Sequence, residues 1–94
     1  MEIKIENELL SAAIRKYGVK EQQFMIVEET AELLDALAKY RRKRVPPSKV
    51  KEEIADVLIM LGQLMLMLPP TESSEVEDFI KYKLARLKKR LKDK

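Results

Sequence analysis

Apolar positions repeat at intervals of three and four residues in four separate stretches of the chain. This spacing is typical of one face of an α-helix, and no stretch alternates apolar and polar residues over a length useful for a strand. The first stretch has its apolar residues at Leu9, Leu10, Ala13, Ile14 and Tyr17. Gly18 follows it directly and is a typical helix stop. We therefore predict an all-α protein whose first helix ends at residue 17.

Proline pairs bound the next two predicted helices. The second helix is expected from about residue 21 to about residue 44, because the prolines at 46–47 cannot continue it. The third helix begins at Ser48, whose hydroxyl can accept hydrogen bonds from free backbone N–H groups as an N-cap. It ends before the prolines at 69–70.

The fourth predicted helix follows "PTESSEVEDF", which offers Thr71, Ser73 and Ser74 as alternative N-caps. Its apolar stripe consists of Val76, Phe79, Ile80, Leu84, Leu87 and Leu91. Short connections between helices favour antiparallel neighbours. We expect residues 1–94 to form one domain, a four-helix subunit.

A chain of 94 residues is small, and domains of this size bury only a little over ~60% of the surface that the unfolded chain exposes. With 46% hydrophobic residues this chain is too apolar to be disordered, and some of its apolar surface needs a partner. Cysteine is absent, which excludes disulfides, thiol nucleophiles and thiolate metal sites.

Charge and hydropathy give an expectation for location. The longest apolar run, residues 57–68, is far short of the ~20 residues that cross a bilayer, so we expect no membrane partner. The beginning, "MEIKIENELL", lacks the pattern of a signal peptide, and we expect a cytoplasmic protein. Residues 81–94 hold eight Lys or Arg against one acid, so this end could face a polyanion.

Acidic residues lie on the apolar face of the second predicted helix. At ~100° per residue, Glu29 and Glu32 are about 60° apart on one face. The apolar residues within roughly 40° of this pair are Met25, Leu33, Ala36 and Tyr40. A second apolar stripe consists of Val27, Ala31, Leu34 and Ala38, so we expect this helix to be covered on two sides.

The third predicted helix repeats this pattern independently. Its acids Glu53 and Asp56 share a face with Val57, Met60, Leu64 and Met67. Burying a carboxylate without compensation costs several kcal/mol, so these groups must be protonated, paired with bases or bound to cations. Four acids close together cannot all ionise unless a cation neutralises them.

Three interpretations of these acids stay open. They can be ordinary surface residues of amphipathic helices, which is the common case for a single acid. They can form a buried salt-bridge network with cations of the fourth helix. They can also bind a metal ion, and metal binding can coexist with such a network.

The donor atoms limit which metal is possible. The chain has neither His nor Cys, so a site made of these acids offers only oxygen, which suits Mg²⁺ or Mn²⁺ and argues against zinc. Mg²⁺ commonly takes further ligands from substrate phosphates, so the site indicates phosphate chemistry. The two glycines stand alone and form no phosphate-binding loop, so phosphate must be held by metal, Lys or Arg.

Two short motifs resemble a known family. "EETAE" at 28–32 and "EIAD" at 53–56 are separated by 20 residues and resemble the EExxE…ExxD signature of the MazG-like all-α nucleoside triphosphate pyrophosphohydrolases. The surrounding segments "YGVKEQQFMIVEETAEL" and "EEIADVLIMLGQL" are similar to members of that group as well. The resemblance thus covers most of the chain.

This resemblance implies a Mg²⁺-dependent enzyme, with Mn²⁺ as a substitute, that cleaves nucleoside triphosphates between the α and β phosphates. The products are a monophosphate and pyrophosphate, and the substrates can include non-standard or surplus nucleotides. The implied metal ligands are Glu29, Glu32, Glu53 and Asp56. Glu28 is the implied residue that orients or deprotonates the attacking water.

The resemblance also implies substrate contacts and an oligomer. Gln22 matches a Gln that lies near the nucleotide in small family members. Lys83 shares a face with the apolar stripe of the fourth helix and is the first candidate for a phosphate contact, with Arg86 next. Several family members carry an Asn beyond the ExxD helix, whereas the only Asn here is Asn7. We expect a homodimer or homotetramer.

The alternative is a non-enzymatic helical interaction module that uses residues 81–94 to bind nucleic acid. It predicts salt-dependent binding that substitution of Glu32 or Asp56 leaves unchanged. This basic segment contains no aromatic residue beyond Tyr82, and no DNA-reading motif is present. Nucleic acid is therefore the less favoured partner.

Overall fold

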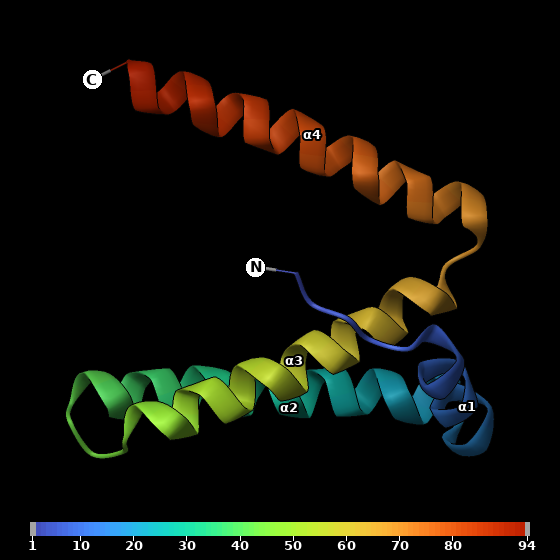
Figure 1. Cartoon of the computed structure of the whole chain (residues 1–94), viewed down its shortest axis with the longest axis horizontal. Helices are drawn as coiled ribbons and strands as arrows, with labels where there is room; N and C mark the ends of the chain where they lie inside the picture. The colour runs from blue at the N-terminus through green and yellow to red at the C-terminus, as the bar shows by residue number, and fades with distance from the viewer. Residues whose placement is uncertain (1, 94) are drawn as a thin grey trace.

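The computed structural model describes residues 2–93 and contains four α-helices. They are α1 (Asn7–Tyr17), α2 (Val19–Arg41), α3 (Pro47–Met67) and α4 (Pro70–Lys92). No strand occurs between residues 2 and 93, so the all-α prediction is confirmed. α2 and α3 lie side by side and antiparallel, α1 packs across one end of this pair, and α4 extends away from it (Figure 1).

Gly18 separates α1 from α2. Its φ of 93° lies in a region that favours glycine, and its N–H donates to the Ile14 carbonyl at 2.8 Å. The predicted end of the first helix is therefore confirmed. α2 begins at once with Val19, two residues before the predicted start.

The second helix also ends earlier than predicted, at Arg41 rather than near residue 44. The amides of residues 42–44 turn back and donate to the carbonyls of Lys39 and Tyr40. Lys43 adopts a φ of 60°, which breaks the helical path before the prolines are reached.

The predicted N-cap of α3 is wrong. Ser48 lies inside the helix, which begins at Pro47 with Pro46 as its N-cap. Proline suits the first helical position because the N–H that it lacks has no partner there and its φ is already helical. The helix therefore begins at Pro47, and the Ser48 hydroxyl does not cap it.

The predicted N-caps of α4 are wrong for the same reason. This helix begins at Pro70 with Pro69 as its N-cap, so Thr71, Ser73 and Ser74 lie in its first turns. The hydroxyl of Ser73 donates to the Pro70 carbonyl at 2.9 Å, and that of Ser74 donates to the Thr71 carbonyl at 2.8 Å. These side chains thus bond backwards along the helix and cap nothing.

The core is small and lies among α1, α2 and α3. Its buried apolar residues are Leu10, Ala36 and Met60. Gly62 allows α1 to approach α3 closely, because a Cβ at this position would lie 2.9 Å from Cδ1 of Leu10. Three polar side chains are buried as well, namely Gln22, Glu53 and Gln63. All three belong to α2 or α3, so the contact between these helices is partly polar.

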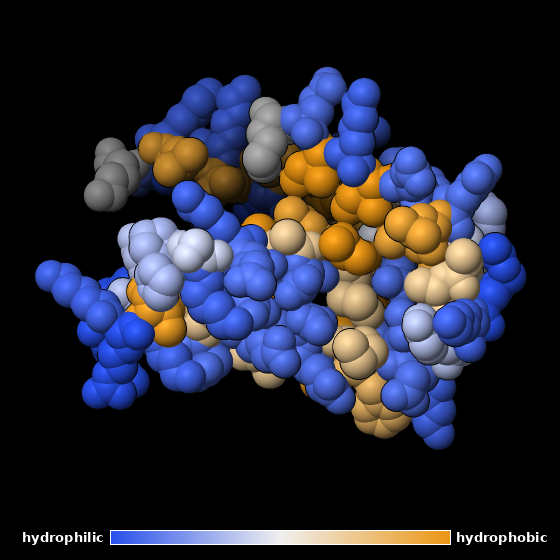
Figure 2. All heavy atoms as spheres, turned by 60° about the horizontal axis from the view of Figure 1, so that its bottom comes forward, coloured by the Kyte–Doolittle hydropathy of each residue, from blue (hydrophilic) through white to orange (hydrophobic). Residues whose placement is uncertain are grey.

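Two predicted apolar stripes remain uncovered in the single chain. α4 does not pack against α1, α2 or α3, and most of its stripe is exposed. The second stripe of α2 is exposed too, so the prediction that this helix is covered on two sides is wrong for one chain. Hydrophobic side chains accordingly gather at the surface between hydrophilic ones (Figure 2). Among residues 2–93, no helix combines the length and apolar character needed to cross a membrane.

Candidate metal centre

A buried amide pair aligns α2 with α3. Nε2 of Gln22 donates to Oε1 of Gln63 at 2.7 Å, and both side chains are buried. Seven residues make about two helical turns. Two turns forward along α2 from Gln22 lies Glu29, and two turns back along antiparallel α3 from Gln63 lies Asp56. The alignment that joins the amides therefore also brings these acids to the same level.

Three carboxylates meet at this level. Glu29 on α2 and Glu53 and Asp56 on α3 each offer an oxygen, and the three oxygens lie within 4.8 Å of one another. Glu53 is only 4% exposed, Glu29 is half-buried and Asp56 is exposed. We call these three residues the carboxylate cluster.

Two oxygens of the carboxylate cluster have no hydrogen-bond partner. Oε2 of Glu29 and Oε2 of Glu53 are both buried, and neither accepts a hydrogen bond from any described residue. A buried carboxylate oxygen without a partner is costly, and a bound cation removes this cost. An all-oxygen donor set of this kind fits Mg²⁺ or Mn²⁺.

The other two predicted acids, Glu28 and Glu32, are not part of the carboxylate cluster. Glu32 is exposed and outside the group of three, but it shares with Glu53 a neighbouring pocket of about 320 Å³. Glu28 is exposed and is also outside the group. The structure thus brings three of the five predicted acids together and leaves Glu28 and Glu32 outside the group.

The pKa of Glu29 is raised above its ordinary value. The largest cause is burial, and the negative charges of Glu32, Asp56 and Glu53 add to it in that order. Without a cation, proton uptake by Glu29 relieves the repulsion within the cluster.

This raised pKa predicts how the stability of the metal-free protein depends on pH. A carboxyl whose pKa is higher in the folded than in the unfolded state contributes stability below its unfolded pKa, and this contribution is lost as pH rises through the folded pKa. We expect Glu29→Gln to become progressively more stable than wild type as pH rises above about 4.5 in EDTA. Chemical denaturation followed by circular dichroism checks this, with exposed Glu52→Gln as the control. Parallel pH curves for wild type and Glu29→Gln would contradict it.

Lys49 is a site residue that the sequence analysis missed. Its Nζ lies 2.8 Å from Oε1 of Glu53, and its side chain lines the 320 Å³ pocket. The salt-bridge interpretation placed the compensating cations on the fourth helix, whereas the structure supplies one from α3 itself. The i, i+4 spacing of Lys49 and Glu53 is the sequence signal that could have identified it.

The predicted substrate contacts lie apart from the carboxylate cluster. Gln22 is buried two helical turns before Glu29, and its side-chain amide donates a hydrogen bond to Gln63. Lys83 and Arg86 are exposed on α4, which does not pack on the helices that carry the cluster. Within one chain, therefore, neither cation belongs to the acidic site.

Comparison with known proteins decides the family. The family model described as "MazG nucleotide pyrophosphohydrolase domain" matches residues 19–93 of the 94-residue chain. The chain belongs to this family. The match covers α2, α3 and α4 and includes both motifs, at 28–32 and 53–56. No curated protein and no solved structure matches the chain significantly.

Membership in the MazG family agrees with the chemistry of the carboxylate cluster. The family description suggests a nucleotide pyrophosphohydrolase, and the cluster could hold a metal ion. All three of its residues, and Lys49 beside it, lie within the matched region. The family match and the carboxylate cluster thus coincide in the same part of the chain.

Lys49 is predicted to compete with the metal for Glu53. Lys49→Met removes the ammonium group beside Oε1 of Glu53. The buried Glu53 carboxylate then has no positively charged partner among residues 2–93 and should bind a cation more strongly. We expect Mn²⁺ to bind roughly three- to tenfold more tightly, a modest change because the lysine is partly exposed. Isothermal titration calorimetry checks this, with Lys39→Met, which removes a pairing with Asp35, as the control. Unchanged or weaker Mn²⁺ binding would rule out the competition.

Proposed function

We propose that this chain is a Mg²⁺-dependent nucleoside triphosphate pyrophosphohydrolase, with Mn²⁺ as a working substitute. It cleaves the substrate between the α and β phosphates and releases a nucleoside monophosphate and pyrophosphate. The observation that carries the proposal is the carboxylate cluster, in which two buried oxygens lack partners in a MazG-family chain.

The proposed metal ligands are Glu29, Glu53 and Asp56, with Glu32 completing the set at the rim. This assignment is supported by the closeness of three of them, since oxygens of Glu29, Glu53 and Asp56 lie within 4.8 Å of one another. A bound Mg²⁺ would neutralise phosphate charge, lower the pKa of a water and stabilise charge developing on the phosphoryl oxygens.

Glu28 is proposed to handle the attacking water. It directly precedes Glu29, is exposed and lies outside the group of three, so its carboxylate is not committed to the cluster. In the reaction, the water oxygen forms a bond to the α phosphorus, and the bond from this phosphorus to the oxygen that bridges the α and β phosphates breaks. Glu28 accepts the proton of the water. Pyrophosphate carries away the negative charge of the broken bond.

The proposed substrate contacts are Gln22, Lys83 and Arg86. The buried Gln22 would have two roles. It would keep α2 and α3 aligned through its hydrogen bond to Gln63, and it would contact the nucleotide. Lys83 and Arg86 lie on α4, which does not pack against the carboxylate cluster of the same chain. Their contribution to substrate binding therefore depends on how chains assemble. We propose that residues 1–94 act as one MazG domain within a homodimer or homotetramer.

A substrate screen tests this proposal. Pyrophosphate release is measured for natural and modified ribo- and deoxyribonucleoside triphosphates with Mg²⁺, with Mn²⁺ and with EDTA. We expect release from at least one triphosphate with metal and none with EDTA. If no triphosphate releases pyrophosphate and the chain binds nucleic acid in a salt-dependent way, the alternative of a binding module replaces the enzyme.

A further inference from the structure

One end of the α2–α3 pair is strongly cationic. Residues 39–49 contain six Lys or Arg and no acid, and we call them the cationic segment. The segment comprises the last turn of α2, the connection between the helices and the first turn of α3 (Figure 1). It reaches the carboxylate cluster at Lys49, whose Nζ lies 2.8 Å from Oε1 of Glu53. Acids and cations thus occupy neighbouring levels of the same helix pair.

Positive charge suits only one of the two helix ends in the cationic segment. Lys39 and Arg41 lie in the last turn of α2, where the helix dipole favours cations. At the beginning of α3 the dipole favours anions instead, but the first turn contains no acid and does contain Lys49. The helix dipole therefore does not explain a cation at position 49, and an anion bound beside Lys49 would be favourable there.

A pocket connects the cationic segment with the carboxylate cluster. This is the pocket of about 320 Å³ that Glu53 lines, and both helices contribute a cation to it, Lys39 from α2 and Lys49 from α3. Val45 lines it as well and is shared with a second pocket of about 430 Å³, which Arg41 lines. Open space next to the buried Glu53 is therefore bordered by lysines.

The net charge around the 320 Å³ pocket changes sign when a divalent cation binds. Three acids and two lysines line the pocket, which gives a net formal charge of −1; they are Glu32, Asp35, Glu53, Lys39 and Lys49. A divalent ion on the carboxylate cluster changes this to +1. The pocket therefore favours an anion once the metal is bound.

Lys49 can contact Glu53 and an anion at the same time. An ammonium group has three N–H donors, and the ion pair that Lys49 makes within residues 2–93 is the one with Glu53. Its side chain is 48% exposed, so the other donors remain accessible. Lys39, by contrast, pairs with Asp35 at 2.8 Å, away from the cluster. Lys49 is thus the lysine that touches the cluster directly and keeps donors for a ligand.

We propose that Lys49 binds the phosphate chain of the substrate in the 320 Å³ pocket. This inference rests on the proposed function and adds a phosphate contact from the same chain that holds the metal. Lys83 and Arg86 do not supply such a contact within one chain, because α4 does not pack on α2 or α3. The ammonium of Lys49 and the metal on Glu53 then both face the same polyanion.

A KM measurement and a binding measurement test this contact together. Lys49→Met is expected to raise KM for the best triphosphate about tenfold and to leave kcat within about threefold, because a half-exposed charged hydrogen bond to the substrate is lost. Binding of inorganic tripolyphosphate with Mg²⁺, measured by calorimetry, should weaken by a similar factor. Lys49→Arg keeps the positive charge and should restore most of the affinity.

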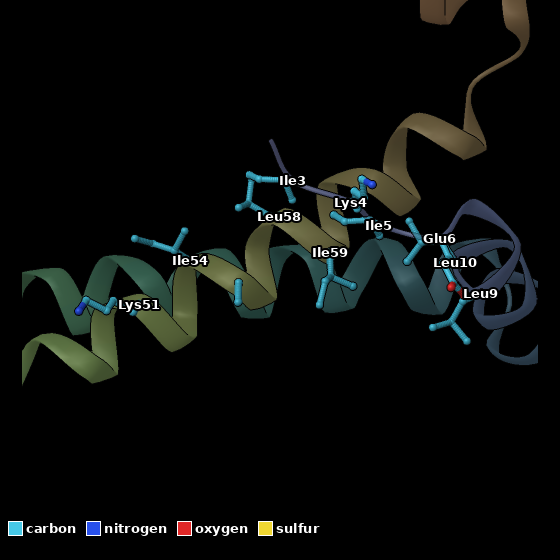
Figure 3. A pocket seen from close by; sticks show the side chains of 11 residues that line it. Ile3, Lys4, Ile5, Glu6, Leu9, Leu10, Lys51, Ile54, Leu58 and Ile59 are labelled. Carbon is cyan, nitrogen blue, oxygen red and sulfur yellow. The ribbon is translucent and has the colours of Figure 1, made fainter. Parts of the chain in front are cut away.

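Lys51→Met is the matched control, since it makes the same change two residues further along α3. Lys51 lines a separate groove of about 580 Å³ together with Ile54 and Leu58 (Figure 3). It does not line the 320 Å³ pocket. Both KM and tripolyphosphate binding should therefore stay within about twofold of wild type in Lys51→Met. Circular dichroism verifies that each variant remains helical.

The direction of the change separates a phosphate contact from a counter-ion. If Lys49 only neutralised Glu53, its removal would strengthen metal binding and leave KM and tripolyphosphate binding unchanged or improved. Either result, or equal weakening in Lys51→Met, overturns the proposal. If no triphosphate is hydrolysed but tripolyphosphate binding still depends on Lys49, the proposed hydrolysis fails and this contact stands. Hydrolysis with an unchanged KM in Lys49→Met has the opposite meaning.

Discussion

Glu53→Gln is expected to lower kcat/KM for the best triphosphate by roughly 10³-fold and to weaken Mn²⁺ binding by at least about 100-fold. Glu53 is the least exposed member of the carboxylate cluster, and its Oε2 has no partner among residues 2–93. Glutamine keeps the shape of the side chain but removes the charge, so a cation at this place loses a ligand and its neutralising partner.

Turnover and Mn²⁺ titration check this prediction together, and circular dichroism verifies that the variant remains helical. The matched control is Glu52→Gln, which makes the same chemical change one residue away on an exposed side chain. We expect Glu52→Gln to stay within about twofold of wild type, as surface substitutions usually do. If Glu53→Gln folds normally and still turns over like Glu52→Gln, the carboxylate cluster is not the metal centre.

The acids of the cluster were predictable because helical periodicity is a local property. Glu29 and Glu32, and separately Glu53 and Asp56, share apolar faces by spacing alone. Which acids meet across two helices depends instead on how the helices are aligned along each other, and no local sequence pattern predicts this alignment. The hydrogen bond between Gln22 and Gln63 reveals that alignment, which brings Glu29 to Glu53 and Asp56 and leaves Glu32 at the rim.

Helix ends were less predictable, because several residues compete for one position. Ser48 is a good N-cap by side-chain chemistry, but the prolines before it favour the first helical position through their backbone. The same competition moved the start of α4 to Pro70. Gly18 was predicted correctly because few other residues adopt its φ of 93°.

The amphipathic character of α4 was predictable, but its place in the fold was not. A stripe of Val, Phe, Ile and Leu predicts only that some surface will cover it. Within residues 2–93, the structure leaves most of this stripe uncovered, because the connection at Leu68 and Pro69 directs α4 away from the other helices. Lys83 and Arg86 were predicted to contact the substrate phosphates. They lie on α4, which in this chain does not pack against the helices that carry the carboxylates.

The last prediction separates Glu28 from the metal ligands. Glu28 is exposed and outside the group of three carboxylates, although it is the immediate neighbour of Glu29. If it accepts the proton of the attacking water, Glu28→Gln should lower kcat by about 10² to 10⁴-fold, the usual contribution of a general base. Mn²⁺ affinity should stay within about threefold of wild type, because no ligand is removed.

Stopped assays of pyrophosphate release and calorimetric Mn²⁺ titration on the same preparation give the two readouts. Glu29→Gln is the comparison, since it should lose both turnover and Mn²⁺ binding. Loss of Mn²⁺ affinity in Glu28→Gln would make this residue a metal ligand instead, and unchanged kcat would require another group, or the metal alone, to activate the water.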